Sequence, residues 1–199
     1  MIVLICLSSC FVLLASIFIF KRQFKDQMGN IVKHMWWGGN PDLPNEFSGL
    51  TKRDIHNVQK SWQIVYSNPV PNGTELLKRF FKAYPHTKNY FKIIKELPEG
   101  EYEKHPQFQA HVMNLMNSLN TAVSSLNNPE IVAALMNKLG ESHGRRNIQE
   151  QDYHDLKNVI VQMFIEVLNL DEDILGSWGK VVTFWYKHIF ETLKQNHTS

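Results

Sequence analysis

Cysteine is scarce in this 199-residue chain, and its two copies, Cys6 and Cys10, both lie within the first ten residues. A scaffold held by disulfides is therefore excluded, and so is a thiolate metal site in the body of the chain. An excess of charge of one sign is also missing. The net charge is +2 with histidine neutral, which provides no strongly basic surface for a nucleic-acid partner. With 43% hydrophobic and 20% charged residues, the composition is that of one folded domain with a short appendage.

A long apolar run without a charged residue opens the chain. As a helix the run would be about 28 Å long, close to the roughly 30 Å of a bilayer hydrocarbon core. We expect residues 1–22 to be a membrane anchor or a signal segment, with a cytosolic core segment as the remaining alternative. Lys21 and Arg22 follow the run where a cleavage site would lie, which favours an uncleaved anchor and a main domain in the cytoplasm. Two sequons, at Asn72 and Asn196, argue weakly for the opposite side of the membrane.

Residue composition and hydrophobic spacing divide the rest of the chain into a tether, residues 23–49, and a main domain, residues 50–199. Prolines and glycines near the end of the tether break any long helix. In the main domain, the alternation of apolar and polar residues that is typical of β-strands is missing, and apolar residues recur at helical spacing. Thr51 and Asp54 resemble a capping box at the start of the first helix. Further helices are expected over residues 73–84, 106–126, 129–144 and around 156–167, and from about 171 onward.

Histidine is unusually frequent, with nine copies, and two of them flank a helix break. His111 lies sixteen residues before Asn127, and His143 lies fourteen residues after Pro129. If the two helices run antiparallel, both imidazoles lie at similar heights, about 24 and 21 Å from the break. Two imidazoles in an apolar slot are suited to axial ligation of a haem iron. A histidine on an apolar face is also a common core residue, so spacing alone leaves both interpretations open. The remaining histidines are expected on the surface, among them His86, His105, His154 and His188.

Several segments follow one another in the order that is typical of one protein family. Trp62 lies in VQKSWQIVY, Phe91 ends LLKRFFKAYPHTKNYF, His111 lies in QAHVMNLMNSLNTAV, and His143 lies in KLGESHGRR. In these segments and in the gaps between them, residues 50–194 resemble the globins, in particular the cytoglobin and neuroglobin branch. The resemblance implies an all-α globin fold of about seven to eight helices around a haem pocket, preceded here by an N-terminal apolar helix.

The resemblance also implies roles for individual residues around a haem b cofactor. His143 would be the proximal ligand of the iron, and its second ring nitrogen needs an acceptor such as a carbonyl one turn back. His111 would lie on the distal side, where it either hydrogen-bonds a bound ligand or ligates the iron itself. Phe91 would pack against the macrocycle, and Leu77 and Leu115 would line the distal pocket. These three apolar residues are equally suited to an ordinary helical core.

The function implied by this resemblance is reversible binding of dioxygen or another diatomic gas, which at a membrane suits sensing or local delivery. A bis-histidyl haem protein for redox or electron-transfer work is the alternative. A helical scaffold that has lost haem is disfavoured by the presence of His143. The chain is not expected to be an enzyme, although nitric oxide dioxygenation or peroxide turnover would be conceivable side activities. Such turnover would need an external reductase, because nothing outside the haem pocket indicates a fused one.

Overall fold

The computed structural model describes residues 35–92 and 94–195. The chain divides between Leu43 and Pro44 into two compact units, and the second unit contains all the predicted site residues. The predicted anchor, residues 1–22, lies outside the described residues. Within the part of the chain that the structure describes, no helix is both long and apolar enough to cross a membrane.

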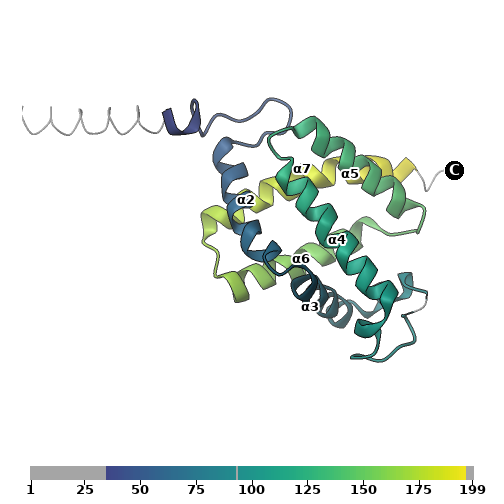
Figure 1. Ribbon diagram of the computed structural model, residues 1–199. Coiled ribbons are helices and arrows are strands. Elements are labelled where there is room, and N and C mark those ends of the chain that lie inside the picture. The colour runs from purple at the N-terminus through teal and green to yellow at the C-terminus, as the bar shows by residue number, and fades with distance from the viewer. Residues whose placement is uncertain (1–34, 93, 196–199) are drawn as a thin grey trace, which may run out of the picture. The chain divides into compact units, whose positions relative to one another are not determined.

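The described elements of the second unit are all helical, which confirms the all-α prediction (Figure 1). The α-helices are α2 (Lys52–Tyr66), α3 (Pro69–Ala83), α4 (Pro106–Ser124), α5 (Pro129–Gly144), α6 (Glu150–Met163) and α7 (Glu172–Gln195). Two 3-10 helices, η1 (Pro85–Tyr90) and η2 (Tyr102–Lys104), lie between α3 and α4, and a π-helix, η3 (Phe164–Leu168), extends α6.

The predicted start of the second helix at Gly73 is wrong, because α3 already begins at Pro69. Pro69 and Pro71 lie in the first turn of α3. The first turn of a helix leaves its N–H groups without intrahelical acceptors, so a proline without an N–H loses nothing there. The two prolines therefore open a helix as well as separating it from α2.

The start of α2 follows the predicted capping box. The hydroxyl of Thr51 accepts a hydrogen bond from the backbone N–H of Asp54 at 3.0 Å, and the Asp54 carboxylate accepts one from the backbone N–H of Thr51 at 3.0 Å. Lys180 of α7 donates to the same carboxylate at 2.9 Å. The cap therefore also ties the start of α2 to α7.

The helices pack around one core in an order that leaves α4 and α5 apart. α5 lies along α7, α3 packs against α4 and α6, and α2 packs against α7 and α4. α4 and α5 are joined by a short connection, residues 125–128, yet they pack closely against other helices and barely against each other. Figure 1 shows the two helices diverging from this connection rather than pairing as a tight hairpin. The predicted histidines lie on these two diverging helices.

Candidate functional site

His143 lies in the last turn of α5, and its ring is fixed by the turn before it. Its Nδ1 atom is 3.0 Å from the carbonyl oxygen of Leu139. A carbonyl oxygen can only accept, so Nδ1 carries the proton and Nε2 keeps a lone pair. The hydroxyl of Ser142 donates to the same carbonyl at 2.9 Å and lies 3.2 Å from Nδ1. The predicted acceptor one turn back is therefore confirmed, and it leaves Nε2 as the atom that can bind a metal.

His111 lies on α4 and is held by Phe91, the residue that follows η1. The two rings meet edge to face, with centroids 4.8 Å apart and planes at 80°. Burial, together with the positive charges that His143 and Arg146 can carry, lowers the pKa of His111 to about 4. His111 is therefore neutral at physiological pH, and one of its ring nitrogens keeps a lone pair.

His143 is neutral for a similar reason. Burial lowers its pKa and the positive charge of Arg146 lowers it further, while the hydrogen bond to Leu139 acts in the opposite direction. The pKa of His111 falls in part because of His143, so the two imidazoles are near enough to interact electrostatically. The structure thus brings together two neutral imidazoles, one from each of the diverging helices α4 and α5.

The three predicted apolar site residues all lie in or against the hydrophobic core. Leu77 of α3 is 3% exposed and belongs to the buried cluster itself. Phe91 and Leu115 are partly buried and pack against that cluster. Leu115 follows His111 by one helical turn, so it lies on the same side of α4. Partial burial at the edge of a core is what a residue that lines a cofactor pocket requires.

Tyr153 of α6 is a neighbour of His143 that sequence reasoning did not place. Its ring centroid is 5.8 Å from that of His143, with planes at 51°. Burial raises the pKa of Tyr153, and its buried hydroxyl oxygen has no hydrogen-bond partner among the described residues. Buried hydroxyls without a hydrogen-bond partner are uncommon in folded proteins. Tyr153 follows His143 across the loop between α5 and α6, so no helical periodicity connects the two residues.

The residues present fit a haem b group between α4 and α5. His143 offers a bare Nε2 atom, His111 is neutral on the other helix, and the surrounding side chains are mostly apolar. The unpartnered hydroxyl of Tyr153 shows that the polar groups beside His143 are not all satisfied by the protein. A flat macrocycle with a metal at its centre and a polar edge meets each of these requirements.

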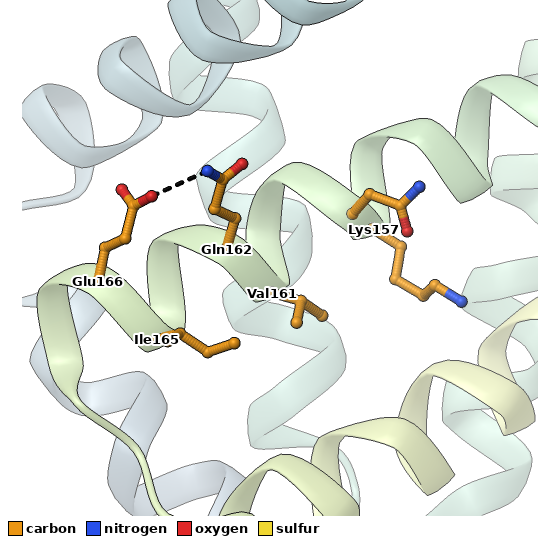
Figure 2. A pocket seen from close by; sticks show the side chains of 6 residues that line it. Lys157, Val161, Gln162, Ile165 and Glu166 are labelled. Atoms are coloured by element: carbon orange, nitrogen blue, oxygen red, sulfur yellow. Dashed lines mark hydrogen bonds between the residues drawn. The ribbon is translucent and has the colours of Figure 1, made fainter.

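The surface pocket shown in Figure 2 is separate from this site, because it is lined only by residues of α6 and η3. Its lining residues are Lys157, Asn158, Val161, Gln162, Ile165 and Glu166. Gln162 donates to Glu166 across it at 2.8 Å. None of the predicted site residues lines this pocket.

One of the histidines expected on the surface is buried. His188 of α7 is 8% exposed, and its ring contacts two phenylalanines that also contact each other. It stacks on Phe47 with centroids 5.9 Å apart and meets the edge of Phe184 at 5.1 Å. Phe47 precedes the helical body, so helical spacing gave no sign that it would cover His188.

The fold and the paired histidines define a globin, and comparison with known proteins shows the same class. The Globin family model matches residues 74–189, more than half of the chain, and the chain belongs to this family. Haem b, with its iron, is accordingly its cofactor.

Individual relatives support this assignment. The chain is 28% identical to cytoglobin-1 of Danio rerio over 153 residues, which covers 74% of this chain and 88% of the relative. Among solved structures, the hexa-coordinate haemoglobin of Drosophila melanogaster matches with a TM-score of 0.67 and 24% identity, over 71% of this chain and 94% of that one. A hexacoordinated haem protein from an anhydrobiotic tardigrade matches with a TM-score of 0.68 and 19% identity, over 75% and 99%. At these identities the two structures show the fold.

Proposed function

We propose that this chain reversibly binds dioxygen or another diatomic gas at a haem b group held by His143. The observation that carries the proposal is the pair of neutral imidazoles on α4 and α5, with the proton of His143 on Nδ1. Ferrous haem, when bound, supplies a site at which diatomic gases bind and leave without chemical change. The protein would contribute the iron-binding nitrogen of His143, apolar surroundings and the distal side chains. The carbonyl of Leu139 fixes the plane of the His143 ring and raises the basicity of Nε2.

His111 has the role of a distal hydrogen-bond donor in this proposal. A neutral imidazole carries one N–H, which donates to a polar diatomic ligand but gives little to an apolar one. Phe91 meets the ring edge to face at 4.8 Å, which restricts how far the imidazole turns. Leu77, in the core, and Leu115, one turn after His111, provide apolar surroundings in which such a hydrogen bond is stronger than it would be in solvent.

Dioxygen dissociation from the His111→Leu variant tests this role. We expect dissociation to become faster by about tenfold or more, because the variant loses a hydrogen bond worth about 1.5 kcal/mol. The rate is measured by stopped-flow on the full chain in detergent. His56→Leu is the matched control, since His56 is exposed on α2 and should leave the rate unchanged. An unchanged rate in His111→Leu would remove His111 from the distal role.

A bis-histidyl redox protein is the second candidate, and the low pKa of His111 favours it. Because that pKa is about 4, the lone pair of His111 stays free of protons throughout the physiological range and is available to the iron. The two solved structures above, from Drosophila melanogaster and a tardigrade, are of hexa-coordinate haem proteins. If His111 ligates the iron, the ferrous protein has sharp six-coordinate visible bands without added ligand, and His111→Leu converts them to a five-coordinate spectrum.

The place of action in this proposal is a membrane surface. The apolar run in residues 1–22 anchors the chain, and Lys21 and Arg22 favour a globin domain in the cytoplasm, where an external reductase returns the iron to the ferrous state. Nitric oxide dioxygenation or peroxide turnover would then be a side activity that depends on this donor. Deletion of residues 1–34 is expected to move the protein from the membrane to the soluble fraction. Recovery of the full chain in the soluble fraction would contradict the anchor.

A further inference from the structure

Three side chains with metal-ligating atoms meet outside the histidine pair. His86 comes from η1, and Asp152 and Asp155 come from the first turns of α6. One atom from each residue, a ring nitrogen or a carboxylate oxygen, lies within 4.8 Å of the other two. The three residues join segments more than sixty positions apart in the chain. We refer to them as the His86 cluster.

The His86 cluster holds two buried carboxylates with little compensating charge. Asp152 and Asp155 are each 6% exposed. Among the ion pairs of the described residues, neither has a lysine or arginine partner, and the Nε2 atom of His86 lies 3.1 Å from Asp152 Oδ1. Two carboxylates this close and this dry repel each other and lose hydration. A divalent cation would compensate both charges at once.

The carboxylates are also held in place by other hydrogen bonds. Asp152 Oδ2 accepts from the backbone N–H of Gln149 and from the hydroxyl of Tyr90, both at 2.8 Å. Burial and the negative charge of Asp152 raise the pKa of Tyr90 to about 12, so this hydroxyl remains a donor. Asp155 Oδ1 accepts from Gln151 Nε2 at 2.8 Å. Ligands oriented in this way lose less conformational freedom when they bind a metal.

We propose that His86, Asp152 and Asp155 bind a zinc-type divalent cation, with water at the remaining position. One imidazole nitrogen and two carboxylate oxygens suit zinc, whereas magnesium and calcium prefer oxygen ligands throughout. Tetrahedral bonds of about 2.1 Å place ligand atoms about 3.4 Å apart. The 3.1 Å contact between His86 Nε2 and Asp152 Oδ1 must therefore widen slightly, and the ligand atoms of the cluster, all within 4.8 Å of one another, need only small shifts. The side chain of His86 already faces Asp152, and because it is 55% exposed its ring has room to shift. The cation takes the place between the Nε2 atom of His86 and the Oδ1 atom of Asp152.

The position of this site connects it to both sides of the histidine pair. Phe91, which follows η1, contacts His111, and Tyr153, which follows Asp152, contacts His143. A cation bound at the His86 cluster would therefore link η1, on the side of His111, to α6, beside His143. Because the ligands come together only in the folded chain, the cation stabilises the native state by mass action. This inference does not depend on which function the haem performs.

Isothermal titration of the full haem-loaded chain with zinc chloride, after treatment with a chelator, tests the proposal. We expect one zinc per chain at the His86 cluster and a rise in the melting temperature on zinc addition. His86→Gln and Asp155→Asn should each weaken zinc binding by about tenfold or more and reduce the thermal shift. Asp155→Asn keeps an acceptor oxygen for Gln151, so its melting temperature without zinc should stay near that of the wild type.

Two controls separate this site from adventitious zinc on surface histidines. His56→Gln removes an exposed histidine elsewhere and should leave zinc affinity unchanged. Magnesium chloride should produce neither binding heat nor thermal shift. Wild-type zinc affinity in both His86→Gln and Asp155→Asn, or no zinc binding in the wild type, would overturn the proposal. The His86–Asp152 contact would then be only a hydrogen bond between η1 and α6.

Discussion

At the scale of single residues, the site is built on imidazoles that the protein keeps neutral. His143 has its proton fixed on Nδ1 by the carbonyl of Leu139, so that Nε2 is bare. His111 is kept neutral first by burial and then by the positive charges that His143 and Arg146 can carry. Neutral imidazole is the form that ligates iron or donates a single hydrogen bond. The same burial has a consequence for stability.

The stability of the haem-free protein is expected to rise with pH between about 4 and 6.5. Burial lowers the pKa of His111 from 6.5 to about 4, so within this window the unfolded chain binds a proton that the folded chain does not. The free energy of unfolding therefore increases with pH, by roughly 3 kcal/mol in total for this residue. The lowered pKa of His143 acts in the same direction.

Urea unfolding of the haem-free chain at several pH values from 4 to 7 measures this dependence. The His111→Leu variant should have a shallower rise across the window than the wild type, because one of the titrating groups is gone. His56→Leu should keep the wild-type slope. Equal slopes in His111→Leu and the wild type would mean that His111 is not buried as described.

At the scale of elements, the position of His143 depends on how closely α5 lies against α7. Gly140 stands one turn before His143 at the crossing of the two helices. A Cβ at this position would lie 2.2 Å from Thr192 Oγ1 and 2.3 Å from the carbonyl oxygen of Ile189. The second contact is with backbone, so it cannot be relieved by turning a side chain. Only glycine allows the two helices to approach as they do.

Gly140→Ala is therefore expected to destabilise the protein by about 1–3 kcal/mol and to weaken haem retention, because α5 must move away from α7. Gly176→Ala is a matched control in α7, where a Cβ meets no atom within 4 Å. That variant should be stabilised by about 0.5–1 kcal/mol, since alanine loses less backbone entropy than glycine in a helix. Urea unfolding and haem loss to an acceptor protein measure both effects. Similar stabilities for the two variants would contradict the close crossing.

At the scale of the whole molecule, the sequence predicts what depends on local periodicity and on the likeness to a family. Helical spacing and the Thr51 capping box predict the all-α architecture and most helix bounds. The family likeness predicts His111 and His143 as partners, and the structure places them on two diverging helices near enough to interact. The start of α3 was mispredicted, because a proline that ends one helix is equally able to begin the next.

Contacts between distant segments could not be predicted in this way. Phe47 stacks on His188 although the two are far apart in the chain, and Tyr90 donates to Asp152 across 62 positions. Such pairs depend on how whole helices are placed, and no local pattern encodes that placement. The buried carboxylates of the His86 cluster could not be predicted either, because helical spacing indicates neither that they are buried nor that a histidine lies beside them.

The absorption spectrum of the full chain, reduced to the ferrous state and recorded before and after carbon monoxide, tests whether His143 holds a haem iron. We expect one haem b per chain and a spectrum that changes on addition of carbon monoxide. We also expect that His143→Ala no longer retains haem, whereas His56→Ala does. Absence of a haem band in the wild type, or a His143→Ala variant with stoichiometric haem and an unchanged spectrum, would contradict the assignment of His143 as the iron ligand.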